Sequence, residues 1–354
     1  MKKRIDKLIA QFDSLGIDCF IVSNARSVRY LSGFTGSNGL CMIAEDERYF
    51  ITDFRYQEQV KEEVRDFDIL ISREYLFDEL KEKNLIKGRK AGFEAKRITF
   101  FDYQKLLAFI PSENFIPVND LIDKLVSVKD DEEIENIKKA SEIGDKIFNE
   151  IIPMIKSGIE EIEISAEISY RIKKYGGEKD AFDPIVLSGT KSALPHGRPD
   201  KNRLKLGEFV LLDFGCVYNG YHSDMTRTVF LGKPNKKEYE IYSTVLEAQK
   251  NAVKSVREGM SCSELDSVAR NFIAEKGFSQ YFGHSLGHGL GLEIHETPKI
   301  SQLNHETLVS RNVITIEPGI YIPNYGGVRI EDDVVVQPNG CIVLTNSPKE
   351  LICV

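Results

Sequence analysis

The amino-acid sequence predicts two domains: a smaller α/β domain at residues 1–126 and a larger α+β domain at residues 127–354. A chain of 354 residues is longer than one hydrophobic core usually serves. Alternating strands and helices in the front part give way, after the polar segment SVKDDEE at 127–133, to long helices mixed with hairpin-like strands. Helices combined with antiparallel hairpins in one domain are typical of the α+β class.

In the front domain, short apolar runs bounded by polar residues are typical of strands, and apolar residues at three- to four-residue spacing are typical of helices. The first helical stretch interrupts its apolar residues with charges, which indicates an amphipathic helix and not a signal peptide. The expected strands are 18–23, 39–45 and 48–53, and the expected helices are 2–14, 54–65, 74–84 and 99–109.

In the rear domain, Ser127 or Asp130 is expected to cap a helix whose first turn is rich in acids, as the helix dipole favours. Glycines shortly after each helical pattern mark the ends of the helices. The expected helices are 131–152, 160–175, 236–257 and 263–276, and the expected strands are 209–216, 223–230, 313–317, 328–336 and 341–345.

Composition excludes several classes of function. Lys and Arg number 47 against 55 Asp and Glu, a net charge of −8 without a basic block, which disfavours sequence-blind binding to nucleic acid. No apolar run approaches the roughly 20 residues of a membrane span. Six cysteines are scattered without a CxxC pair, which indicates reduced thiols and a cytoplasmic protein.

Five residues with side chains that ligate metals recur in strand-like sequence: Asp213, Asp224, His288, Glu317 and Glu331. Three of the carboxylates lie in the otherwise apolar runs VLLDFG, VITIEPG and GVRIEDDVVV. A buried, unpaired carboxylate costs several kcal/mol or keeps its proton. Cations placed among the carboxylates would remove that cost, so the pattern predicts a metal site.

A hairpin brings the first two acids together. Asn219 and Gly220 form the strongest short hairpin signal, and the register they set places Gly215 opposite Asp224. Asp213 shares the face of Gly215, so it is the diagonal neighbour of Asp224, roughly 6–8 Å away. Two divalent ions about 3.5–4 Å apart would fit between these carboxylates, and Gly215 would leave room for them.

Two positions stay open. The strand period puts Glu331 and Asp333 on one face and Asp332 on the other, and only one of the three acids need be a ligand. Lys299 is a charge in a predicted loop, either solvated or part of a site. The Gly-rich stretches lack the strand–GxxxxGK[ST]–helix context of a phosphate-binding loop.

Several motifs in order resemble the creatinase-like, or "pita-bread", metallopeptidases, a family that includes methionine aminopeptidase, Xaa-Pro aminopeptidase and Xaa-Pro dipeptidase (prolidase). The resemblance covers residues from about 130 to the end, and more loosely SVRYLSGFTGS (27–37), which looks like the family's smaller N-terminal domain. The matching stretches are LPHGRP (194–199), LLDFG (211–215), GYHSDMTRT (220–228), GHSLGHGLGLEIHETP (283–298), TIEPGIY (315–321) and GVRIEDDVVV (327–336).

The resemblance implies a pita-bread catalytic domain that binds two divalent metal ions. Asp213 would bind one ion, Asp224 and Glu331 would bridge both, and His288 and Glu317 would complete the sites. Oxygen-rich ligation with a single imidazole suits Mn²⁺, Co²⁺ or Zn²⁺, with Mn²⁺ the first choice.

The resemblance also implies a mechanism in which a hydroxide bridging the metals attacks the scissile carbonyl. Glu317 would carry the proton to the leaving nitrogen, and His284 would help to stabilise the oxyanion. The remaining residues would bind substrate or orient a ligand: His196 and His295 would line the pocket, Tyr321 would supply a hydroxyl, and Arg329 would hold an acidic ligand in place.

Within the family, the front domain and the histidines His284 and His295 favour the Xaa-Pro exopeptidases over methionine aminopeptidase. The substrate would be a proline-containing peptide, and a homodimer is expected. Prolidases often carry HExPR where this chain has HETPK, so Lys299 keeps the charge but loses the bidentate fork. Dipeptidase and aminopeptidase activity both stay open. The alternatives are a methionine aminopeptidase-like or other aminopeptidase, or a non-peptidase creatinase-like hydrolase or binding scaffold.

Overall fold

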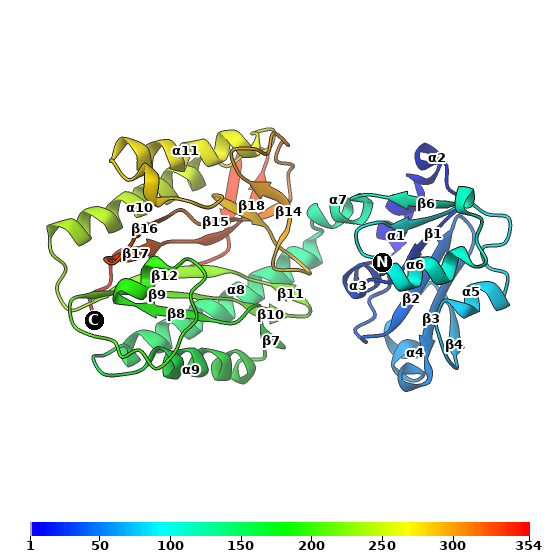
Figure 1. Cartoon of the computed structure of the whole chain (residues 1–354), viewed down its shortest axis with the longest axis horizontal. Helices are drawn as coiled ribbons and strands as arrows, with labels where there is room; N and C mark the ends of the chain where they lie inside the picture. The colour runs from blue at the N-terminus through cyan, green and yellow to red at the C-terminus, as the bar shows by residue number, and fades with distance from the viewer. Residues whose placement is uncertain (1) are drawn as a thin grey trace. The chain divides into compact units, whose positions relative to one another are not determined.

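The computed structural model describes residues 2–354, so Met1 lies outside it. The chain divides into two compact units, Met1–Val126 and Ser127–Val354. Figure 1 shows the first unit in blue to cyan and the second in green to red. Within residues 2–354, no helix combines the length and the apolar character that crossing a membrane requires. All six cysteines are free thiols.

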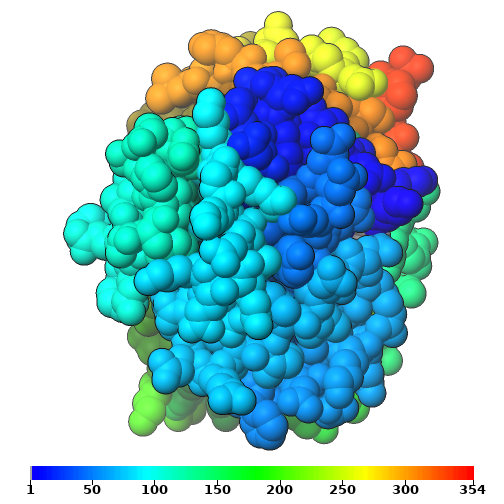
Figure 2. All heavy atoms as spheres, turned by 90° about the vertical axis from the view of Figure 1, so that its right-hand side faces the viewer, coloured from blue at the N-terminus to red at the C-terminus, as the bar shows by residue number. Residues whose placement is uncertain are grey.

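The first unit is built on a six-stranded mixed sheet in the order β4-β3-β2-β1-β5-β6. β1 pairs antiparallel with β2 and parallel with β5, which places the earliest strand in the middle of the sheet. Figure 2 shows one face of this unit in blue to cyan. Its strands are β1 (Cys19–Val22), β2 (Gly39–Ala44), β3 (Arg48–Asp53), β4 (Asp68–Ser72), β5 (Ala91–Glu94) and β6 (Phe115–Val118).

The helices of this unit are shorter than their periodicity predicts. The stretch 2–14 is divided into α1 (Lys2–Ile9) and α2 (Phe12–Leu15), which Gly16 ends in the left-handed conformation. Two short helices in succession bury apolar residues at the same spacing as one long helix, so the apolar pattern alone does not distinguish the two arrangements. The others are α3 (Ala25–Ser32), η1 (Phe54–Tyr56), α4 (Gln59–Glu63), α5 (Asp78–Glu82), α6 (Phe100–Leu107), η2 (Ser112–Asn114) and α7 (Leu121–Ser127).

In the second unit, strands lie between two pairs of long helices (Figure 1). Apolar residues of α8 (Asp131–Ile151) and α9 (Glu161–Lys174) pack against β8 (Ile185–Ser188), β9 (Glu208–Phe214) and β12 (Met225–Leu231). A second core joins α10 (Lys236–Ser255) and α11 (Cys262–Glu275) to β15 (Val313–Ile316) and β18 (Asp332–Gln337). Asp130 caps α8 in a reciprocal capping box with Glu133, as the acid-rich start predicts.

Shorter elements complete the unit. β13 (Gly287–Gly289) and β14 (Glu296–Ile300) extend the sheet β14-β13-β15-β18-β19, which ends at β19 (Gly340–Val343). The two-stranded sheet is formed by β16 (Gly319–Ile322) and β17 (Gly326–Arg329). The remaining elements are η3 (Ile152–Met154), β7 (Lys179–Asp180), η4 (Gly189–Ala193), β10 (Cys216–Tyr218), β11 (Tyr221–His222) and η5 (Ser279–Tyr281).

The hairpin has the predicted register. Tyr218 pairs with Tyr221 beside the Asn219 turn, and on the same register Asp213 pairs with Thr226. Gly215 has a different role from the expected one. A Cβ atom on it would lie 1.8 Å from the carbonyl oxygen of Ser223. The glycine therefore makes room for a backbone carbonyl of the facing strand and not for metal ions.

The expected strand 328–336 is interrupted at Ile330 and Glu331, between β17 and β18. In the gap, the Glu331 N–H donates to the carbonyl of Thr226 at 3.1 Å, and the Glu331 carbonyl accepts from Arg227 at 2.5 Å. The backbone groups that the interruption leaves unpaired thus find partners on β12. This anchors Glu331 beside the strand that follows Asp224.

Candidate metal centre

The five predicted metal ligands come together in the second unit, and each lies in a strand or directly next to one. Asp224, His288 and Glu331 each bring one potential ligand atom to within 4.8 Å of the other two. The Nε2 atom of His288 lies 3.6 Å from Oδ2 of Asp224 and 3.5 Å from Oε1 of Glu317. Asp213 joins the cluster electrostatically, since its charge raises the pKa values of Asp224 and Glu331.

The carboxyl groups disfavour one another's ionisation in the absence of a cation. Burial and then the neighbouring Glu331 raise the pKa of Asp224 well above its ordinary value. The pKa of Glu317 is raised well above its ordinary value for the same reasons. Burial and then Asp213 raise the pKa of Glu331 to about 8. Without a cation, this site therefore keeps protons that isolated carboxylic acids would lose.

Two further observations fit divalent cations. The Oδ1 atoms of Asp213 and Asp224 are buried and have no hydrogen-bond partner among residues 2–354. Burial lowers the pKa of His288 to about 4, so its imidazole is neutral near pH 7. Its Nδ1 lies 3.0 Å from the Gly289 carbonyl; the proton assigned there leaves Nε2 unprotonated toward the carboxylates. Oxygen-rich ligation with one imidazole suits Mn²⁺, Co²⁺ or Zn²⁺.

Arg329 supplies a fixed positive charge next to the cluster. Its buried guanidinium forms an ion pair with Asp213 and donates to the Thr226 hydroxyl at 3.0 Å. It also donates to the Tyr321 hydroxyl at 2.7 Å, and that oxygen lies 2.9 Å from Nε2 of His284. Because Arg329 can only donate, the Tyr321 proton is directed at the imidazole. Burial and then Arg329 lower the pKa of His284 to about 4.

The remaining predicted residues have exposed side chains and lie around His284 and His288. The His288 and His295 rings meet edge to face, with centroids 4.3 Å apart. His196 is exposed. Burial is the main cause of the lowered pKa values of His284 and His295, and the neighbouring His196 lowers both further. Lys299 is the cross-strand partner of His288 between β13 and β14, so both side chains project from the same face. Lys299 therefore lies at the site and is not a remote loop charge.

Sequence reasoning predicted that Arg329 holds an acid, but it missed the other groups that do so. The Thr226 hydroxyl donates to Oε2 of Glu331 at 2.6 Å. Asp333 is also held: its Oδ2 accepts the backbone N–H of Asp224 at 3.0 Å and the Ser141 hydroxyl at 3.2 Å, while its buried Oδ1 has no hydrogen-bond partner among residues 2–354. Thr226 shares the parity of Asp224 along its strand, and this signal could have identified it.

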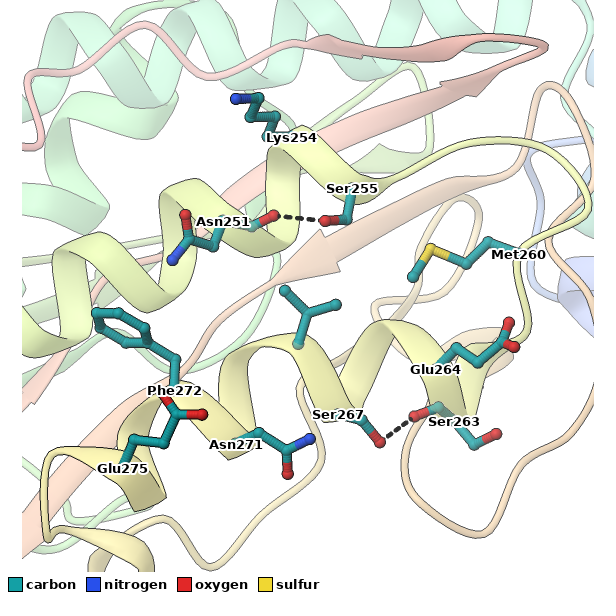
Figure 3. A pocket seen from close by; sticks show the side chains of 11 residues that line it. Asn251, Lys254, Ser255, Met260, Ser263, Glu264, Ser267, Asn271, Phe272 and Glu275 are labelled. Carbon is teal, nitrogen blue, oxygen red and sulfur yellow. Dashed lines mark hydrogen bonds between the residues drawn. The ribbon is translucent and has the colours of Figure 1, made fainter.

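A separate open groove of about 690 Å³ lies between α10 and α11. Figure 3 shows that its lining is mostly polar, with Ser255 and Ser267 bonded to carbonyls of their own helices. None of the five clustered residues lines this groove. The groove is therefore separate from the carboxylate cluster.

Comparison with known proteins agrees with this geometry. Residues 135–338 match the model of metallopeptidase family M24, and residues 4–127 match the creatinase/prolidase N-terminal domain. The chain belongs to metallopeptidase family M24. Its fold is the family's pita-bread domain, preceded by the creatinase-type domain, as the motifs predict.

Three relatives of this M24 chain resemble it over essentially their whole length. The Xaa-Pro dipeptidase of Pyrococcus furiosus is 42% identical over 99% of this chain and 100% of its own. The solved structure of an Xaa-Pro dipeptidase from Bacillus anthracis is 43% identical, with a TM-score of 0.97 over 100% of this chain and 99% of that one. The X-Pro aminopeptidase structure from Thermotoga maritima is 41% identical, with a TM-score of 0.91 over 98% and 100%.

Proposed function

We propose that this metallopeptidase hydrolyses the peptide bond between an N-terminal residue and proline, and that Xaa-Pro dipeptides are its preferred substrates. The observation that carries the proposal is the convergence of Asp213, Asp224, His288, Glu317 and Glu331 beside exposed histidines and a lysine. The full-length similarity to proteins named Xaa-Pro dipeptidase supports the choice of bond.

Two divalent ions, with Mn²⁺ favoured, are proposed to occupy the cluster. Asp213 and His288 would each face one ion, Asp224 and Glu331 would lie between the two, and Glu317 would complete the set. Bound divalent ions polarise a carbonyl and lower the pKa of a bound water to about 7. The positive charges would also deprotonate the carboxyl groups whose pKa values are raised in their absence.

The surrounding residues are assigned to the substrate. Glu317 moves a proton toward the leaving nitrogen, because its carboxyl group lies at the edge of the cluster and remains partly exposed. The Tyr321 hydroxyl, which Arg329 polarises, stabilises the oxyanion by turning its proton from Nε2 of His284 to the substrate, and His284 helps by holding that hydroxyl in place. His196 and His295 hydrogen-bond the backbone of the substrate. Arg329 also fixes Asp213 in place through its ion pair.

Lys299 favours the dipeptidase over the aminopeptidase. A dipeptidase must recognise the free carboxylate of the terminal proline, which requires a cation near the cluster. Lys299 is exposed and projects from the strand beside His288, which places an ammonium group on the substrate side. An Xaa-Pro aminopeptidase is the second candidate, because the Thermotoga maritima relative carries that name at similar identity.

The deciding experiment compares hydrolysis of Met-Pro, Met-Pro-Ala and Met-Ala by protein loaded with Mn²⁺. Rapid cleavage of Met-Pro alone supports the dipeptidase, and faster cleavage of Met-Pro-Ala means the aminopeptidase. Cleavage of Met-Ala without Met-Pro would exclude the Xaa-Pro assignment. Metal analysis of the same preparation excludes the binding scaffold if two equivalents of ion are retained.

A homodimer in the cytoplasm is also proposed. The scattered, free cysteines support a reducing compartment. Light scattering behind a sizing column measures the mass directly: about 80 kDa is expected for two chains of 40.2 kDa. A mass near that of one chain would contradict the dimer.

A further inference from the structure

The segment Phe282–Leu286 carries His284 but belongs to no helix or strand. Its backbone polar groups therefore lack ladder partners and must be satisfied in another way. It leads directly into β13, which carries His288. Whatever fixes this segment also fixes the backbone from which the imidazole of His284 projects.

An ion pair on helix α11 supplies the partners. Asp266 is fully buried, and its two oxygens accept from Nε of Arg270 at 2.6 Å and from a terminal nitrogen at 2.8 Å. The same guanidinium donates to the carbonyl of Phe282 at 2.9 Å and to that of His284 at 2.7 Å. Oδ1 of Asp266 accepts the N–H of Leu286 at 3.0 Å. One ion pair thus holds three alternate residues of the segment.

The contacts continue into the metal centre. The Arg270 guanidinium lies 4.2 Å from the centre of the Phe282 ring, which in turn packs edge to face on His284 at 5.1 Å. The Leu286 carbonyl accepts the backbone N–H of Glu317 at 2.8 Å. The pair itself lies outside the carboxylate cluster and shares no hydrogen bond with the five ligands.

We propose that Asp266 and Arg270 are positioning residues for the reaction, which set the place of His284 through the backbone of Phe282–Leu286. The geometry requires arginine, because the guanidinium must serve a carboxylate on one edge and two carbonyls on another. A lysine would keep the charge but could not span these acceptors. The proposal deepens the proposed function and rests on it for the kinetic readout.

The test compares Arg270→Lys and Arg270→Met with the control Arg171→Met. Arg171 is matched because it also pairs with a carboxylate one turn away on its helix, Glu167, and is similarly buried. Its guanidinium contacts only α8 and its own helix. Melting temperature and bound Mn²⁺ are measured for all three variants, so that folding and metal loading are known before kinetics are interpreted.

With Met-Pro as substrate, both Arg270 variants are expected to lose roughly 10- to 100-fold in kcat, while KM changes less than about threefold, because misplacement of a catalytic group acts mainly on the chemical step. Wild-type kcat in folded, metal-loaded Arg270→Met would overturn the proposal. If that variant does not fold, Arg270→Lys decides by the same criterion. The control is expected to keep its kcat.

A second readout does not depend on hydrolysis. In protein labelled with ¹⁵N-histidine, the His284 signals are identified by their loss in His284→Gln. They are expected to shift in both Arg270 variants and to stay in place in the control. Unchanged His284 signals would refute the positioning role even if the wild type cleaved no Xaa-Pro peptide. Failure of the proposed function is recognised separately, by inactivity of the loaded wild type.

Discussion

Replacing Asp224 with asparagine should stabilise the metal-free protein while destroying its metal site. Asp224 is buried, its Oδ1 has no hydrogen-bond partner among the described residues, and its closest charged neighbours include Glu331. Ligand oxygens of Asp224 and Glu331 lie within 4.8 Å of each other, so two full charges there would repel by at least roughly 3.5 kcal/mol at an effective dielectric constant of about 20. Partial protonation at pH 7–8 reduces this, so a gain of about 1–2 kcal/mol in unfolding free energy is expected.

The assay is urea denaturation of chelator-treated protein, with calorimetric titration of Mn²⁺ in parallel. Loss of a residue that only supports a metal ligand typically lowers metal affinity 10- to 100-fold, and loss of a direct ligand should cost more. The affinity of Asp224→Asn for Mn²⁺ should therefore fall by at least about a hundredfold. Hydrolysis of Met-Pro should be abolished. The control is Asp145→Asn. Asp145 is also buried, but its carboxylate accepts from Asn346 and Ser347, so the substitution should destabilise the protein and leave Mn²⁺ binding unchanged.

A metal-free Asp224→Asn protein that is less stable than the wild type and binds Mn²⁺ equally well would contradict both the repulsion and the metal role of Asp224. Such a protein would show that Asp224 is held by favourable contacts and not strained by like charges. Increased stability with normal hydrolysis would separate the repulsion from the metal role, and would exclude Asp224 as a ligand.

Three further predictions concern Glu331, Gly215 and Lys299. Metal-free protein should lose on the order of 1–2 kcal/mol of stability between pH 6.5 and 8, because Glu331 has a folded pKa of about 8, above its ordinary 4.5, and its proton favours the folded state until the pH passes that value. His284 and His288, with pKa values lowered to about 4, act in the opposite direction only below pH 6.5. Denaturation at several pH values measures this, and a rise in stability over that window would contradict it. Gly215→Ala should cost at least about 2 kcal/mol, measured by urea denaturation, because its Cβ meets the Ser223 carbonyl; near-neutral stability would disprove the close approach. Lys299→Met should raise KM for Met-Pro at least about tenfold and leave Met-Pro-Ala unaffected, whereas Lys254→Met, in the groove of Figure 3, should change neither.

From the sequence alone, the five residues that cluster in the second unit and much of the frame around them could be predicted. Asn219-Gly220 specifies a two-residue turn, and the strand period of two then places Asp213 and Asp224 on one face without tertiary information. Long amphipathic helices were predicted to within one or two residues, because their caps and apolar stripes are local signals. Acids in apolar runs indicated the metal site because burying them alone is costly.

The contacts that hold these side chains in place could be known only from the tertiary structure. Arg227 and Thr226 interrupt the expected strand at Glu331, and these partners lie more than a hundred residues away. Gly215 faces a carbonyl whose position depends on strand pairing, and Arg270 reaches His284 from the side of a helix. Such contacts are set by packing between distant segments, which no local periodicity encodes. For the same physical reason, the sequence left Lys299 undecided until β13 and β14 placed it beside His288.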